Sequence, residues 1–116
     1  MCGICGIANF VKPSASEARK VIVSQMNQAM LHRGPDESGW HADPFVTLAM
    51  RRLSIIDLAG GSQPVYSTDG KLMVIQNGEI YNYRELRADL EKRGYVFQTQ
   101  SDTEVLLVMY REYGTD

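Results

Sequence analysis

The chain lacks the features that mark disulfide-rich, membrane-spanning and nucleic-acid-binding proteins. Only two cysteines are present, Cys2 and Cys5, and a loop closed between them is too short to stabilise a fold. No segment approaches the roughly 20 apolar residues that span a bilayer, and the amino terminus lacks the pattern of a signal peptide. The formal net charge is -2, with no long run of Lys or Arg. We therefore expect a cytoplasmic protein without nucleic-acid or membrane partners, acting on small polar molecules.

Length and composition allow one modest hydrophobic core. The 116 residues are 44% hydrophobic, so residues 1–116 form one domain at most. Helical and strand patterns alternate without an internal repeat, which predicts an α+β fold with antiparallel pairing. The last helix has no following strand to cover its apolar face, so we expect the domain to be incomplete at its C-terminus.

The first half of the chain predicts two strands separated by a helix and a loop. An apolar strand over 3–10 is followed by a helix that opens with Ser14 and Glu17 as a capping box and ends near Gly34. A polar loop then covers 32–44, and a second strand covers 45–50. The predicted buried face of the helix consists of apolar residues at helical spacing: Ala18, Val21, Ile22, Met26, Ala29 and Met30.

The second half predicts a hairpin followed by two helices. A strand over 72–75 and a return strand over 79–81 flank Asn77-Gly78, a strong hairpin signal. One helix starts at Asn82 and ends at Gly94, and a strand over 95–99 follows. The last helix opens at Ser101, with Glu104 in the capping-box position, and ends at Gly114.

Cys2 is the first candidate for chemistry. Initiator methionine is usually removed before a small residue, which would leave a thiol and a free α-amine on the same residue. An α-amine has a reference pKa of about 7.7–8.0, so it can accept and return a proton as the thiol's own base. A second-position cysteine alone is a weak signal, so other residues must support it.

Three other interpretations of the cysteines remain open. Cys2 and Cys5 have the spacing of a redox pair or of half a zinc site. However, eight residues separate His32 from His41, which is outside the usual zinc spacing. A papain-like hydrolase would use one of these histidines as its base. The residues could also belong to a non-catalytic fragment that keeps the motifs without holding them in place.

A free amino acid needs one fixed cation and one fixed anion to hold its head group. Arg52 follows the strand over 45–50 and has the planar fork that binds a carboxylate, whereas Arg51 should point to the opposite face. Asp102 could bind an ammonium group, and Asn77-Gly78 offers two donors for an oxyanion. Each also has a simpler interpretation. Arg52 could be a solvated arginine at the end of a strand, Asp102 an acid that caps a helix, and Asn77-Gly78 only a turn.

Together these residues resemble the class II (N-terminal nucleophile) glutamine amidotransferases, and most closely the glutaminase domain of glutamine-hydrolysing asparagine synthetases. The resemblance covers nearly the whole chain. The segments that carry it are MCGICGIA at 1–8, HRGPDESG at 32–39, RRLSIIDL at 51–58, NGEIYNYREL at 77–86 and SDTE at 101–104.

The resemblance implies a role for each matching residue. Cys2 matches the nucleophile, Arg52 the arginine that binds the glutamine carboxylate, and Asn77 with Gly78 the oxyanion donors. Glu79 and Asp102 match positions that hold the amino group of glutamine. Two further groups match a strip that lines the pocket and a loop that shapes it: Leu53, Ser54, Ile55 and Ile56 for the strip, and Arg33, Gly34 and Asp36 for the loop.

The resemblance also implies an αββα sandwich of antiparallel sheets flanked by helices, and a longer enzyme. That enzyme would use ATP and magnesium in a synthetase domain, absent from this chain, to make asparagine from aspartate with the released ammonia. This chain itself is expected to hold neither a cofactor nor a metal, because Gly60-Gly61 lacks the lysine of a phosphate-binding loop. A homodimer is among the assemblies that the sequence leaves open.

Overall fold

The structure, a computed structural model, describes residues 2–11, 16–53 and 61–116. The chain divides into two compact units, Met1–Ile56 and Asp57–Asp116, and each is described by itself. The described residues form three helices and antiparallel strands, which confirms the predicted mixture of helix and sheet. The layer order of an αββα sandwich stays a prediction. No helix in the described ranges is long and apolar enough to cross a membrane.

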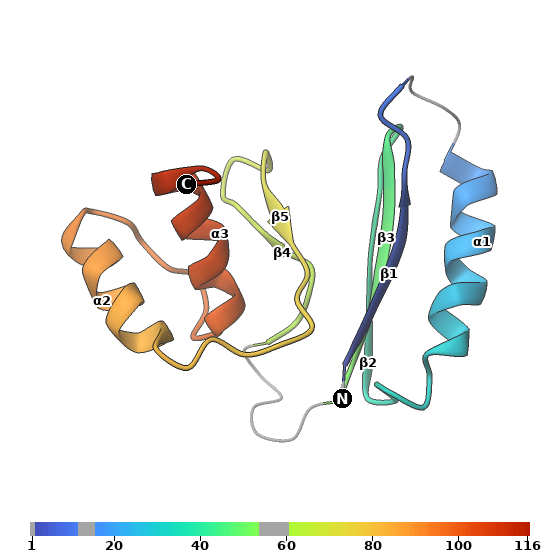
Figure 1. The fold of residues 1–116 in the computed structure, drawn as a ribbon, viewed down its shortest axis with the longest axis horizontal. Helices are drawn as coiled ribbons and strands as arrows, with labels where there is room; N and C mark the ends of the chain where they lie inside the picture. The colour runs from blue at the N-terminus through green and yellow to red at the C-terminus, as the bar shows by residue number, and fades with distance from the viewer. Residues whose placement is uncertain (1, 12–15, 54–60) are drawn as a thin grey trace. The chain divides into compact units, whose positions relative to one another are not determined.

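The first unit is a three-stranded antiparallel sheet covered on one face by a helix. The strands β1 (Gly3–Ala8), β2 (Glu37–Ala42) and β3 (Val46–Arg52) have the order β1-β3-β2. Helix α1 (Ser16–Ala29) runs along one face of this sheet (Figure 1). The apolar residues of β3 make it the central strand, with Ala49 and Met50 fully buried.

Strand β2 lies inside the segment that the sequence predicts as a loop, so that prediction is wrong. The segment is rich in turn-forming residues, but its residues 37–42 pair one by one with residues of β3. Asp43 closes the hairpin, because its Oδ1 accepts hydrogen bonds from the N–H groups of Phe45 and Val46 at 2.7 and 2.8 Å. The His41 ring and these N–H groups lower the pKa of Asp43. Local turn chemistry therefore fixes the β2–β3 register.

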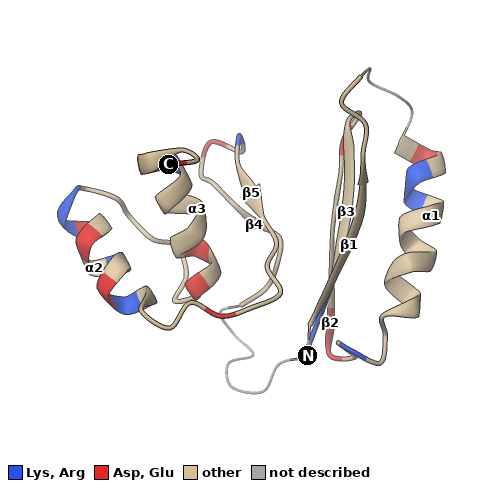
Figure 2. Cartoon of the chain, viewed as in Figure 1, with Lys and Arg blue, Asp and Glu red and all other residues tan. Residues whose placement is uncertain are grey.

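Helix α1 is present, but the predicted buried face is wrong. Its buried residues are Arg19, Val23 and Asn27, whereas Val21 and Ile22 are 60% and 48% exposed. Both buried polar residues donate to the sheet side: the Arg19 guanidinium to the Asp43 carbonyl at 2.6 Å and the Asn27 Nδ2 to the Ser38 hydroxyl at 2.9 Å. Figure 2 shows that the charged residues of α1 lie in its N-terminal part. Ser14, the predicted capping residue, lies outside the described residues.

The second unit packs one helix against another helix and a short hairpin. Strands β4 (Val65–Tyr66) and β5 (Met73–Val74) pair with each other, and α3 (Asp102–Tyr113) contacts both this hairpin and α2 (Tyr83–Lys92) (Figure 1). The buried residues of the core come from all but β5: Val65, Leu90, Val105, Leu107 and Val108. This core explains why an apolar stripe recurs along α3.

Several predicted boundaries in this unit are confirmed and others are wrong. Ser101 caps α3 by accepting from the Thr103 N–H at 3.1 Å, and Gly114 ends the helix with a φ of 67°. Residues 79–81 and 95–99 form no strand, and the partner of β5 is β4. Glu104 is buried and accepts from the N–H groups of Gln98 and Thr99, so it supports the preceding segment in place of a strand.

Candidate active site

Cys2 lies directly before β1, next to the end of β3. The antiparallel register pairs Gly3 with Arg51, and extending it by one residue places Cys2 level with Arg52. The Arg33 Nε donates to the Cys2 carbonyl at 3.2 Å. Cys2, the predicted nucleophile, and Arg52, the predicted carboxylate-binding residue, therefore lie opposite each other at the same end of the adjacent strands β1 and β3.

Cys2 and Cys5 belong to opposite faces of the sheet by strand alternation. Cys5 faces α1, where its thiol contacts the Val23 carbonyl at 4.0 Å. A Cβ on Gly3 would lie 2.9 Å from the sulfur of Met30, the residue that follows α1, so Gly3 is also on the α1 side. Cys2, one position earlier, belongs to the other side. Burial raises the pKa of the Cys5 thiol and so disfavours its thiolate. This geometry disfavours a redox pair or a zinc site that needs both sulfurs.

The loop before β2 packs against the backbone at the end of β3. A Cβ on Gly34 would collide with the backbone of Arg51 and Arg52, so only glycine fits there. The Asp36 N–H donates to the Arg52 carbonyl at 3.2 Å. The structure thus brings Arg33, Gly34 and Asp36 to the backbone of Cys2 and Arg52, where the resemblance expects a shaping loop.

Arg52 is held by an ion pair with the neighbouring strand. Its guanidinium lies 3.1 Å from the Glu37 carboxylate, and its side chain is 13% exposed. The Arg51 Nε instead donates to the Asn27 carbonyl on α1 at 3.3 Å, so the prediction that the two arginines face opposite sides is confirmed. Leu53 follows and is half-buried. The remaining pocket-lining candidates, Ser54, Ile55 and Ile56, lie outside the described residues.

The other predicted site residues lie in the second unit. Asn77, Gly78 and Glu79 are exposed in the segment between β5 and α2, and Asp102 is the first residue of α3. The Asp102 Oδ2 accepts from the Ile80 N–H at 2.9 Å. Asp102 is therefore bonded to the residue that directly follows Glu79, which brings the two predicted amino-group ligands into one local cluster.

Three residues that the sequence did not indicate complete this cluster. Gln76, just before Asn77, donates its N–H to the Gln63 Oε1 at 2.7 Å, and its side chain accepts from the Thr103 hydroxyl at 3.1 Å. Gln63 lies outside the segments that carry the resemblance, and Thr103, although part of SDTE at 101–104, was given no role there. Only the proximity of Gln76 to Asn77 and of Thr103 to Asp102 in the sequence could have indicated them.

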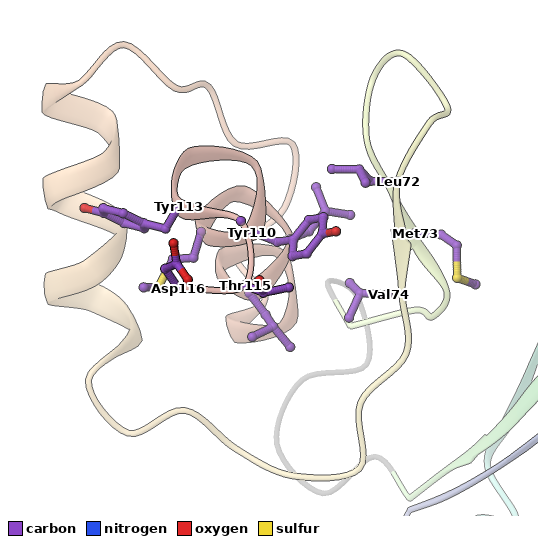
Figure 3. Close-up of a pocket in the computed structure, with 11 residues that line it drawn as sticks. Leu72, Met73, Val74, Tyr110, Tyr113, Thr115 and Asp116 are labelled. Carbon is purple, nitrogen blue, oxygen red and sulfur yellow. The ribbon is translucent and has the colours of Figure 1, made fainter.

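A separate pocket of about 640 Å³ in the second unit lies between β5 and the C-terminal part of α3. Figure 3 shows Val74 of β5 and Leu72, which directly precedes β5, directed toward α3, where Tyr110 extends toward them. None of the predicted site residues lines this pocket. Within the described ranges, no three His, Cys, Asp or Glu residues gather as a metal site would require.

Comparisons with known proteins extend the resemblance over the whole chain. The family model described as a glutamine amidotransferase domain matches residues 1–116. Asparagine synthetase [glutamine-hydrolyzing] 1 of Bacillus subtilis is 49% identical over 97% of this chain and 18% of its own length. Asparagine synthetase B [glutamine-hydrolyzing] of Escherichia coli is 44% identical over 100% of this chain and 20% of its own length. Asparagine synthetase [glutamine-hydrolyzing] of Zea mays is 42% identical over 100% of this chain and 19% of its own length.

The chain spans about a fifth of the length of these curated relatives, between 18% and 20%. The match of the family model to all 116 residues and the identities above 40% confirm the resemblance that the five sequence segments indicated. The chain therefore belongs to the glutamine amidotransferase domain family.

Proposed function

We propose that this chain hydrolyses the side-chain amide of glutamine to glutamate and ammonia, with Cys2 as the nucleophile. The observation that carries the proposal is the register that places Cys2 level with Arg52, in a chain of the glutamine amidotransferase domain family. A nucleophile beside a carboxylate-binding arginine suits a substrate whose reacting carbon lies a few bonds from its carboxylate.

The reaction proceeds in two steps. The Cys2 sulfur bonds to the amide carbon of glutamine, the Cys2 α-amine takes the thiol proton and passes it to the departing nitrogen, and ammonia leaves a γ-glutamyl thioester. Water then attacks the thioester, which breaks the carbon–sulfur bond, restores the thiol and releases glutamate. This base requires Met1 to be removed, because a peptide nitrogen cannot accept the proton.

The remaining residues hold the substrate and stabilise the charge that forms on it. Arg52 binds the α-carboxylate, and Glu79 with Asp102 binds the α-ammonium group. The Asn77 side-chain amide and the Gly78 N–H donate to the oxyanion of each tetrahedral intermediate. By resemblance, Leu53 to Ile56 are the candidates for the lining of the glutamine pocket.

In a longer protein like its relatives, the released ammonia serves an ATP- and magnesium-dependent synthetase domain that makes asparagine from aspartate. The names and lengths of the relatives support this role. No residue of this chain is assigned to ATP or magnesium. We further propose that the complete domain is an αββα sandwich of antiparallel sheets flanked by helices. We also propose a cytoplasmic location and, as one assembly, a homodimer.

The test is glutamate release from glutamine by cysteine variants of the full-length protein. Cys2→Ala should abolish the activity, whereas Cys5→Ser should retain most of it, because Cys5 packs on α1. An extra residue inserted between Met1 and Cys2 should also abolish activity by removing the α-amine. Activity that survives this insertion but is lost in His32→Ala or His41→Ala would instead support a papain-like mechanism.

A further inference from the structure

The segment that carries Asn77, Gly78 and Glu79 is anchored at both ends to the first turn of α3. After Glu79, the Ile80 N–H donates to the Asp102 carboxylate at 2.9 Å. Before Asn77, the Gln76 side chain accepts from the Thr103 hydroxyl at 3.1 Å. The three residues in between are exposed and belong to no helix or strand. Their position therefore depends on the two anchors.

The anchor before Asn77 is a closed set of three polar side chains. The Gln63 Oε1 accepts from the Gln76 N–H at 2.7 Å, and the Gln63 Nε2 donates to the Thr103 hydroxyl at 3.4 Å. Thr103 is 3% exposed, so water cannot easily replace a lost hydrogen bond. The set thus fixes both the backbone and the side chain of Gln76.

The Gln76 side chain also lies close to Gly78, one of the proposed oxyanion donors. A Cβ built on Gly78 would lie 3.6 Å from the Gln76 Nε2. The Gln76 amide therefore lies next to Gly78, and a shift of Gln76 reaches Gly78 through the backbone of Asn77. Oxyanion donors act within a narrow range of distance, about 2.7–3.1 Å from the developing charge, so small displacements matter.

We propose that Thr103, through Gln76 and Gln63, is a positioning residue that fixes the oxyanion donors Asn77 and Gly78. This inference rests on the proposed glutaminase function and deepens it. We assign Thr103 no contact with glutamine. Its loss therefore acts on the transition state and not on substrate binding, in contrast to Asp102, which both anchors Ile80 and binds the ammonium group.

The test compares Thr103→Val, which keeps the shape of the side chain and removes the hydroxyl, with Thr103→Ser, which keeps the hydroxyl. Steady-state glutamine hydrolysis is measured in the full-length protein, and kcat is divided by the fraction of Cys2 that 6-diazo-5-oxo-norleucine labels. Thr103→Val should lower kcat about tenfold or more and leave KM within about twofold of the original. Thr103→Ser should restore kcat to within about threefold.

Thr47→Val is the matched control. Thr47 is also fully buried, and its hydroxyl accepts from the Arg19 Nε at 3.4 Å in the first unit. This variant loses a buried hydroxyl away from Asn77 and Gly78, so its kcat per labelled Cys2 should stay within about twofold of the original. A fall as large as that of Thr103→Val would show a general effect on folding and overturn the proposal.

The remaining outcomes separate the inference from the proposed function. If Thr103→Val does not fold, Gln76→Met removes the same hydrogen bond from its other side and should give the same loss of kcat. Unchanged kcat in the folded variant, or a loss that Thr103→Ser does not restore, would overturn the positioning role while the function stands. Absence of glutamine hydrolysis in the original protein would overturn both.

Discussion

Arg51 and Arg52 are adjacent in the sequence, but the pleat of β3 gives them different partners. Arg51 donates to the Asn27 carbonyl on α1, and Arg52 pairs with Glu37 on β2. The ion pair holds the Arg52 fork at the same end of the sheet as Cys2, where the proposed substrate carboxylate binds. One position along a strand therefore separates a structural arginine from the arginine that we propose binds the substrate.

This difference predicts opposite sensitivities to a conservative change. Arg52→Lys should raise the KM for glutamine about tenfold or more, because an ammonium cannot reproduce hydrogen bonds to a carboxylate that contribute ~1.5–3 kcal/mol. Arg51→Lys, the control, should leave KM within about twofold of the original. Steady-state kinetics of the two variants measure the difference. Equal KM values would exclude Arg52 from the carboxylate site.

Asp69 ties the turn between β4 and β5 to α3. The Ser67 hydroxyl, the Lys71 N–H and the Arg111 guanidinium all donate to its carboxylate. The Ser67 hydroxyl contributes most to holding the pKa of Asp69 well below the 3.8 of a free side chain, followed by the other two. The charged carboxylate is therefore the form that the folded chain favours.

The lowered pKa predicts a pH-dependent effect of Asp69→Asn. A carboxyl group whose pKa is lower in the folded state stabilises that state above the unfolded pKa and loses this contribution as pH falls through the folded pKa. Urea unfolding should thus find Asp69→Asn less stable than the original at pH 7, and the difference should shrink as pH falls below 3.8. A difference that does not change with pH would contradict the assigned contacts.

At the scale of elements, α1 shows that a helical apolar pattern predicts the helix without predicting its buried face. The exposed Val21 and Ile22 lie beside the buried Val23 on the helix, and the buried face includes Arg19 and Asn27 because both find partners on the sheet side. Sequence patterns treat such polar residues as exposed, so the face that tertiary hydrogen bonds select is not visible in them.

Two valines on α1 test the observed face. Val23→Ala should lower the free energy of unfolding by about 1–3 kcal/mol, because Val23 is fully buried and its loss leaves a cavity. Val21→Ala, at a position 60% exposed, should change it by no more than about 0.5 kcal/mol. Chemical denaturation measures both. The reverse order of effects would restore the face that the hydrophobic pattern predicted.

The elements that the sequence predicted correctly have local causes, and those it missed were hidden or misplaced by turn-forming residues. The start of α3 follows from the Ser101 cap, and its end from Gly114. Strand β2 was missed because its segment is rich in turn-forming residues, although it pairs with β3 directly across the Asp43 turn. The Asn77-Gly78 signal placed the partner of β5 after it, whereas the partner is β4, which precedes it. At the candidate site, Cys2 and Arg52 were proposed from motifs, whereas Gln63 lies outside the motifs and Thr103 was given no role within SDTE.

At the scale of the whole molecule, the residues proposed for catalysis belong to both compact units. Cys2 and Arg52 are in the first, and Asn77, Gly78 and Asp102 are in the second. The nucleophile alone can react with an electrophile in an unfolded chain, but selective protection by glutamine requires a formed binding site. Protection by the substrate is therefore a stricter criterion than labelling.

The most direct test of Cys2 as the nucleophile is the intact mass of the full-length protein after treatment with 6-diazo-5-oxo-norleucine, with and without glutamine. We expect that Met1 is absent, that one adduct forms on Cys2, and that glutamine prevents this adduct while Cys5 stays unmodified. A protein that keeps Met1, or an adduct that glutamine does not prevent, would contradict the assignment of Cys2 as the glutaminase nucleophile.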